Sequence, residues 1–348
     1  MKATVSFRHV RRWGTVVPVA GWRALLGLLL LASPQLVADD ALLNASYDVT
    51  REFYKEFNEA FARHWQETTG HKVTIDQSHG GSSKQARAVI DGLEADVVTM
   101  NQALDIDMLF EKGGLVPKNW AERLPNNSAP YTSTILILVR KGNPKLIRDW
   151  SDLIRPGVSV VVPNPKTSGN GRYSYLAAWS YALQLPGGSD DKARAFVTSL
   201  FKNVPVLDTG GRGATTTFVQ RGIGDVLLTF ESEVQAIRQE FGSANLEVVV
   251  PSVSILAENP VTWVDRVVAK HKSTQVAQAY LKYLWSEPGQ EIAARHHFRP
   301  RLPEVQARHQ AGFPTLELRT VDAVFGSWAA AQKRHFNDGG IFDQIYHP

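Results

Sequence analysis

The 348-residue chain contains no cysteine. Disulfide bonds, thiolate metal sites and cysteine nucleophiles are therefore excluded from its chemistry. A chain of this length can bury enough apolar surface to fold as two domains without covalent cross-links. Its hydrophobic content of 43% and charged content of 21% are ordinary for a globular protein, so its stability must come from its core.

An excess of positive charge is also absent once the first 38 residues are set aside. The whole chain has a formal net charge of +4, from 38 Lys and Arg against 34 Asp and Glu. Residues 1–38 hold five of the basic residues and none of the acidic ones, so subtracting them leaves 33 basic against 34 acidic residues. This balance argues against a nucleic-acid partner.

Residues 1–38 have the pattern of a secretion signal. They combine a basic start, an apolar core at residues 24–32, a helix breaker at Pro34 and the small residue Ala38 at a plausible cleavage point. The alternative is a membrane anchor, but the apolar core is well short of the roughly 20 residues that span a bilayer. We expect export and cleavage near Ala38, and Arg11-Arg12 leaves open whether export is general or twin-arginine.

Beyond the signal, short apolar strands alternate with amphipathic helices, a pattern typical of parallel α/β sheets. An aromatic residue every fourth position from Phe53 to Trp65 predicts a helix with one face in the core. Extended segments at residues 131–140 and 253–264 indicate that the chain crosses between two lobes. An ordinary central strand remains the alternative for the first of these. Near the C-terminus we expect one helix over about residues 320–335.

Three loops of Gly and Ser or Thr, at residues 78–84, 164–171 and 209–215, each join a strand to a helix. At such a junction several backbone N–H groups lack intrahelical partners and lie at the positive end of the helix dipole. Three junctions in one chain predict a small anion held by neutral donors at the carboxyl ends of strands. None of the loops has the glycine-lysine-hydroxyl ending of a phosphate-binding Walker loop.

Catalytic patterns are weak by comparison. The histidines show no zinc-ligand spacing with a carboxylate base, and no serine lies in a nucleophile elbow. We therefore expect a binding protein with no metal and no cofactor, while an anion-processing hydrolase remains the alternative from another class. We interpret Asp105 and Asp107 as a solvated helix start. Arg212, inside the third loop, could assist anion binding, or could be a surface charge or pair with Asp208.

At these loops the sequence closely resembles the periplasmic sulfate/thiosulfate-binding proteins of ABC importers. The shared segments are residues 42–48, 75–85, 129–134, 139–144, 163–169, 208–218, 298–300 and 324–328. The resemblance covers essentially the whole chain after the signal. It implies an α/β fold of the type II periplasmic binding protein class, with two lobes, a hinge and a ligand cleft between the lobes.

The resemblance also implies boundaries for the lobes. Residues 39–128 and 256–310 would form the first lobe, residues 129–255 the second lobe, and residues 311–348 a C-terminal helical segment. The ligand would be sulfate or thiosulfate, and the partner a membrane ABC permease. We expect a monomer in the periplasm that binds no nucleic acid.

Carried over by motif, the site uses backbone N–H groups and two hydroxyls. The implied binding residues are Asp48, Ser82, Ser168, Gly169, Asn170 and Gly211. Sulfate and thiosulfate carry no proton near neutral pH, so a site built of donors suits them. Phosphate carries a proton that needs an acceptor, and an unmatched buried polar group costs about 1–3 kcal/mol. Another oxyanion receptor, for phosphate or molybdate, remains an alternative.

Two departures from the sulfate-specific branch affect the expected ligand. That branch has a glycine where this chain has Asn170, and a tryptophan N–H donor where this chain has Phe230. Together with Asn101-Gln102 and residues 210–217, these positions resemble the thiosulfate-binding branch. An apolar ring beside the anion would suit a large, weakly hydrated sulfur atom. We therefore expect a preference for thiosulfate and count Phe230 and Arg212 among the candidate site residues.

Overall fold

The computed structural model describes residues 39–242 and 245–346. The predicted signal peptide and its cleavage point near Ala38 lie outside these residues. Within them, no helix is both long enough and apolar enough to cross a membrane.

A four-stranded sheet with the order β12-β3-β1-β2 forms the first half of the fold. Its strands are β1 (Asp40–Tyr47), β2 (Val73–Gly80), β3 (Val97–Thr99) and β12 (Val261–Trp263). β1 pairs in parallel with β2 and β3, whereas β12 is antiparallel to β3. The helices of this half are α1 (Arg51–Thr69), α2 (Ser82–Ile90), α3 (Ala103–Glu111), α4 (Pro125–Ser128), α9 (Asp265–His271), α10 (Thr274–Tyr283) and α11 (Glu287–Arg295).

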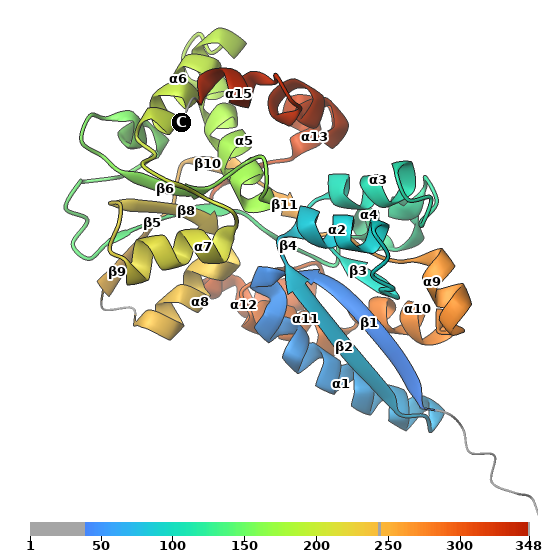
Figure 1. Ribbon diagram of the computed structural model, residues 1–348. Coiled ribbons are helices and arrows are strands. Elements are labelled where there is room, and N and C mark those ends of the chain that lie inside the picture. The colour runs from blue at the N-terminus through green and yellow to red at the C-terminus, as the bar shows by residue number, and fades with distance from the viewer. Residues whose placement is uncertain (1–38, 243–244, 347–348) are drawn as a thin grey trace, which may run out of the picture. The chain divides into compact units, whose positions relative to one another are not determined.

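The predicted aromatic stripe is the core face of α1, which runs along β1 and β2 in Figure 1. Phe53, Phe57 and Phe61 are fully buried, and Trp65 is nearly so. Phe57 meets Tyr280 of α10 edge to face with ring centroids 5.2 Å apart. Rings in such contacts add to the free energy of burial, so this stripe fixes α1 against the sheet.

A five-stranded mixed sheet with the order β7-β6-β8-β5-β9 forms the second half. Its strands are β5 (Ile135–Arg140), β6 (Val160–Pro163), β7 (Leu207–Asp208), β8 (Val226–Phe230) and β9 (Leu246–Val249). Its helices are α5 (Gly169–Gln184), α6 (Asp190–Lys202), α7 (Gly211–Thr215) and α8 (Glu231–Phe241), and α7 continues as a π-helical turn over Thr216–Gln220. The central strands are apolar on both faces because helices cover both sides.

A short three-stranded sheet, β11-β4-β13, lies where the chain passes between the two larger sheets. Its strands are β4 (Tyr131–Ser133), β11 (Ala257–Glu258) and β13 (Arg299–Pro300). The expected long strand near residues 132–139 is therefore divided at Thr134. The Thr134 hydroxyl donates to the Ile255 carbonyl at 2.8 Å, and the chain then enters β5. The exact lobe boundaries stay a prediction.

The expected single helix over residues 320–335 is wrong. The chain forms α13 (Val321–Phe325), α14 (Trp328–Ala331) and a π-helical turn, η7 (Gln332–Phe336), before α15 (Ile341–Ile345). Gly326 has φ of 81°, a backbone conformation that ends α13 and that glycine adopts without strain. Trp328 then packs edge to face on Tyr173 of α5, with ring centroids 5.0 Å apart.

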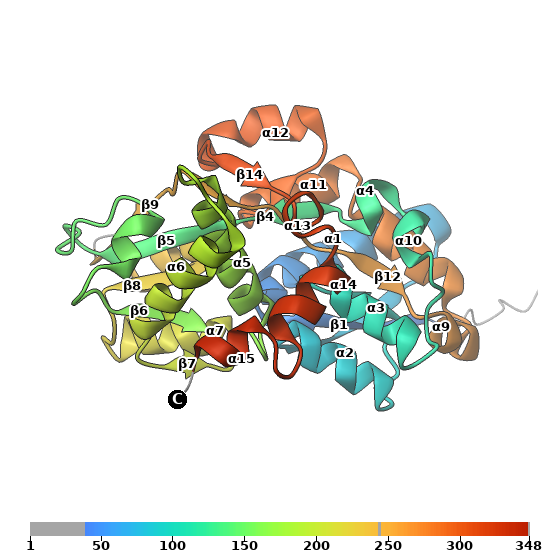
Figure 2. The same ribbon diagram turned by 90° about the horizontal axis from the view of Figure 1, so that it is seen from above.

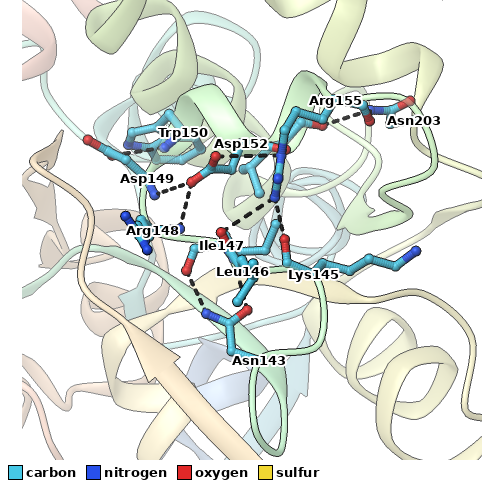
Figure 3. A network of polar contacts seen from close by, with 11 residues as sticks. Asn143, Lys145, Leu146, Ile147, Arg148, Asp149, Trp150, Asp152, Arg155 and Asn203 are labelled. Carbon is cyan, nitrogen blue, oxygen red and sulfur yellow. Dashed lines mark hydrogen bonds and ion pairs between the residues drawn. The ribbon is translucent and has the colours of Figure 1, made fainter.

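The loop between β5 and the short helix η3 (Trp150–Ile154) satisfies its polar groups internally, as Figure 3 shows. The Asn143 side chain exchanges two hydrogen bonds with the backbone of Ile147, at 2.7 and 2.9 Å. Asp149 and Asp152 form a reciprocal capping box at the start of η3. This arrangement fixes the loop without help from a ligand. β10 (Val253–Ile255) and β14 (Glu317–Arg319) form a two-stranded parallel sheet, and α12 (Pro303–His309) lies between α11 and β14 in sequence.

Candidate functional site

The helices that follow the Gly and Ser or Thr loops begin earlier than the sequence suggested. α2 begins at Ser82, inside the loop expected at residues 78–84, and α5 begins at Gly169, inside the loop expected at residues 164–171. In α5 the reason is an N-cap, because the Ser168 hydroxyl accepts a hydrogen bond from the backbone N–H of Gly171 at 3.4 Å. The predicted binding residues therefore occupy first helical turns.

First-turn N–H groups have no intrahelical acceptor. Among residues 39–242 and 245–346, no hydrogen-bond partner exists for the backbone N–H groups of Ser82, Gly169, Asn170 and Gly211. Each belongs to the first turn of α2, α5 or α7, where the helix dipole is positive. These groups are free to donate to an anion.

Asn101, which follows β3, joins the Ser82 loop to the start of α5. Its backbone N–H donates to the Ser82 hydroxyl at 3.1 Å. Its side chain packs directly on Gly169, where an added Cβ would lie only 2.1 Å from Asn101 Oδ1. Only glycine fits at position 169 while Asn101 keeps this place. The contact brings the two loops together although they are far apart in sequence.

Glu233 of α8 joins the start of α5 to the start of α7. Asn170 Nδ2 donates to Glu233 Oε2 at 3.3 Å and to the Thr229 hydroxyl at 2.9 Å. The Thr229 hydroxyl also donates to Glu233. A Cβ added to Gly211 would lie 3.0 Å from Glu233 Oε2. The Asn170 side chain is thus used inside the protein, while its backbone N–H remains free.

Burial controls the acidic groups near these loops. It raises the pKa of Glu233 to about 7, with repulsion from Asp48 adding to the shift and hydrogen bonds from Thr229 and Thr215 opposing it. Burial also raises the pKa of Asp48, against opposing backbone hydrogen bonds. Both shifts disfavour negative charge beside the free N–H groups. Asp48 lies at this site, since a Cβ on Gly210 would be 3.7 Å from its Oδ2.

Phe230 and Arg212 lie at the margin of this group. Phe230 ends β8, is 1% exposed and meets Tyr173 of α5 with ring centroids 5.7 Å apart. The Arg212 side chain is half exposed and pairs with Glu240 at 3.3 Å. The suggested ion pair between Arg212 and Asp208 is therefore wrong. Asp208 accepts a hydrogen bond from the Thr217 hydroxyl instead. Arg212 is close enough to lower the pKa of Glu233 but is held by a surface pair.

A buried network of polar side chains beside the loops was not predicted from the sequence. Arg172 of α5 donates through Nη1 to the Ser83 hydroxyl at 3.0 Å, and Ser83 donates to Asp105 at 2.7 Å. Gln102 also donates to Asp105, at 3.0 Å. Asp105 is 0% exposed, so its interpretation as a solvated helix start is wrong. Burial lowers the pKa of Arg172, and the charge of Asp105 opposes that shift.

Two cavities flank the converging loops. The first, here called the mixed-charge cavity, has a volume of about 520 Å³ and is lined by Asp48, Arg212 and Glu233 together with residues of α1, α8 and α11. The second, here called the basic cavity, has a volume of about 880 Å³ and is lined by Ser83 and Arg172 together with residues of α2, α3 and η7. The loops therefore lie between two cavities whose lining residues differ in charge.

Comparison with known proteins gives a consistent picture. The family described as bacterial extracellular solute-binding protein matches residues 42–299. The thiosulfate-binding protein of Pseudomonas aeruginosa is 61% identical over 311 residues, which is 89% of this chain and 93% of that protein. The sulfate-binding protein of Salmonella typhimurium is 58% identical over 318 residues, 91% of this chain and 96% of that protein. The structure of a sulfate-binding protein from Mycobacterium tuberculosis matches with a TM-score of 0.77 and 31% identity, covering 86% of this chain and all of that one.

Proposed function

Since the chain belongs to the bacterial extracellular solute-binding protein family, with the two-lobed α/β fold of type II periplasmic receptors, we propose that it binds sulfate or thiosulfate. It is exported to the periplasm, where it captures the anion and delivers it to the membrane permease of an ABC importer. It carries out no chemical step on the ligand. The names of its relatives and the geometry of its loops support this function.

The observation that carries the proposal is the convergence of free backbone donors. The N–H groups of Ser82, Gly169, Asn170 and Gly211 come from three helix starts that Asn101 and Glu233 tie together. The hydroxyls of Ser82 and Ser168, and the backbone N–H of Asp48, complete the proposed set. Such a set binds a dianion without a proton. Hydrogen phosphate would need an acceptor for its proton, which this set of donors does not supply, and an unmatched buried polar group costs about 1–3 kcal/mol.

The preferred ligand is thiosulfate. Phe230 places an apolar ring where a tryptophan would supply an N–H donor, and a large, weakly hydrated sulfur atom needs a donor less than an oxygen does. Arg212 contributes at most a weak field, because its charge is half exposed and paired with Glu240.

The test is a set of thermal melts of the mature chain with thiosulfate, sulfate, phosphate, molybdate and chloride at equal ionic strength. A ligand at 1,000 times its Kd adds about 4 kcal/mol of apparent stability. We expect a large rise in Tm with thiosulfate, a smaller rise with sulfate, and none with phosphate, and an equal or larger rise with sulfate would contradict the preference for thiosulfate. A rise with phosphate alone would contradict the donor-only site. No rise with any oxyanion would leave the hydrolase alternative, to be tested by turnover of a model ester.

A further inference from the structure

The basic cavity differs in net charge from the mixed-charge cavity. It lies between α2, α3, the start of α5 and η7, and Figure 2 shows α14, which leads into η7, beside α3. Its acidic lining residues are Glu111 and Asp338. Its basic lining residues are Arg87, Lys112, Lys166, Arg172 and Lys333. The cavity therefore has a clear excess of positive charge.

Most of this charge is not neutralised by ion pairs. Lys166 pairs with Asp338 at 3.1 Å and with Asp343 at 2.9 Å. In contrast, no carboxylate of residues 39–242 or 245–346 lies within 4.0 Å of the side-chain nitrogens of Arg87, Lys112 or Lys333. These three side chains are exposed and can turn toward a ligand in the cavity.

The fourth charge, Arg172, is built into the cavity wall. The residue is only 5% exposed, and its Nε has no hydrogen-bond partner in the described part of the chain. Leaving a buried donor unsatisfied costs about 1–3 kcal/mol unless something in the cavity accepts from it. Because Arg172 lies one turn after Ser168 and bonds to Ser83, which follows Ser82, this wall borders two of the proposed binding loops. An anion in the cavity would therefore be next to the proposed inner site.

The mixed-charge cavity on the other side provides the contrast. Its basic residues Arg51, Arg212 and Arg295 are matched by Asp48, Glu52 and Glu240, while the fourth acidic residue, Glu233, has a pKa of about 7 and is only partly ionised near neutral pH. A balanced lining gives an approaching dianion little net attraction. The two cavities therefore differ in net charge, and the basic cavity attracts a dianion more strongly.

We propose that the basic cavity is an outer binding site for a divalent oxyanion, in which Arg87, Lys112, Lys333 and Arg172 hold the anion before it reaches the donors of the inner site. This inference rests on the proposed function, since it takes the inner ligand to be a dianion. Three of the four cations of the outer site are exposed, flexible side chains, so the anion binds there weakly and keeps most of its water. It raises the rate of capture, whereas the inner donors set how long the anion stays.

The experiment is stopped-flow measurement of thiosulfate and sulfate binding by tryptophan fluorescence at low and high ionic strength. The test variant carries Arg87→Gln, Lys112→Gln and Lys333→Gln together. The control variant carries Lys202→Gln, Arg221→Gln and Lys282→Gln, which remove the same charge from exposed positions that do not line the cavity. Arg172 is left intact because its removal could disturb the fold.

We expect the association rate of the test variant at low salt to fall about three- to tenfold, within the range that electrostatic steering provides. The dissociation rate should stay unchanged, and the effect should disappear above about 0.5 M salt, where charges are screened within a few ångströms. The control variant should bind at nearly the wild-type rate. Equal slowing of both variants, or no slowing of either, would overturn the outer site, whereas the proposed function would stand as long as thiosulfate or sulfate still binds at equilibrium.

A second experiment distinguishes two ligands that the basic cavity could bind, a free oxyanion and the phosphate of a lipid headgroup. Flotation with vesicles containing an anionic phospholipid should show no difference between wild type and the test variant. Vesicle binding that the triple substitution abolishes, together with an unchanged association rate, would overturn the proposal in favour of a membrane headgroup.

Discussion

Two loops in the second half of the fold start alike and end differently. Both follow a strand and lead into a helix, and each has an asparagine near its start, at Asn143 and Asn164. In the first loop the capping box of Asp149 and Asp152 satisfies the start of η3, and the Trp150 indole donates to a backbone carbonyl at 2.8 Å. In the second, Ser168 satisfies only one N–H group.

The difference shows how one local motif can serve stability or binding. A helix start that is fully capped contributes about 1 kcal/mol to folding. A helix start that leaves two N–H groups free contributes less to the free energy of folding. An anion that accepts hydrogen bonds from these groups stabilises the helix start when it binds. We expect substitutions in the first loop to change stability alone, and substitutions in the second to change affinity. The predictions below test this separation in order of decreasing effect.

The largest effect is expected for Gly169→Ala. The new Cβ would lie 2.1 Å from Asn101 Oδ1, so either Asn101 or the start of α5 must move. Overpacking of this kind costs about 1–3 kcal/mol, and we expect the affinity for thiosulfate to fall about tenfold to a hundredfold. Isothermal titration measures it. Gly312→Ala is the matched control, since a Cβ there meets nothing within 4 Å. An unchanged affinity would separate Gly169 from the site.

The second effect concerns Glu233 and pH. Its folded pKa of about 7 lies above its ordinary value of 4.5, so the unfolded chain releases this proton first as pH rises. Wild-type stability should therefore fall, relative to Glu233→Gln, by about 1 kcal/mol per pH unit between about pH 5 and pH 7, and level off above that. Urea unfolding at four pH values measures the difference. A constant difference from pH 5 to pH 8 would show that Glu233 is ionised throughout.

The third effect is in the internally satisfied loop. Asp149→Ala removes the cap of η3 and should lower the free energy of unfolding by about 1 kcal/mol. The affinity for thiosulfate should not change, because the loop uses its own polar groups. Thermal melts and titration of the same preparation measure both quantities, with Asp149→Asn as a variant that keeps a capping oxygen. A loss of affinity with unchanged stability would break the comparison between the loops.

The smallest effect is expected for Phe230→Trp, which offers an indole N–H where the chain has only a ring. One hydrogen bond contributes about 0.5–1.5 kcal/mol, so the ratio of sulfate to thiosulfate affinity should rise severalfold. Because the ratio compares two ligands in the same variant, a general loss of affinity from crowding at this buried position cancels. Phe230→Leu is the control without a donor, and an equal rise in both variants would assign the preference to ring size instead.

The sequence was sufficient to predict what local chemistry determines. Gly and Ser or Thr between a strand and a helix predict an N-terminal turn with free donors, and the three loops take that form. The aromatic period of four predicts the buried face of α1. Residues carried over by resemblance, such as Gly169 and Asn170, do occupy first turns, although their contact with an anion stays a prediction.

What the sequence did not indicate depends on residues that meet only in the folded chain. Ser83, Asp105 and Arg172 form one buried network, but each alone looks like a polar residue near a helix start. Arg212 has an acidic residue nearby in sequence at Asp208, yet pairs with Glu240 one helix further on. Pairing of this kind is set by how α7 and α8 pack on the sheet, which periodicity does not report.

The contact between Asn101 and Gly169 also limits the order in which this protein can change. A larger residue at position 169 clashes as long as Asn101 is present, whereas a smaller residue at position 101 clashes with nothing. Two such contacting positions are coupled, so the effect of one substitution depends on the other. An alanine at position 169 should therefore cost less affinity when residue 101 has already been made smaller than when Asn101 is present.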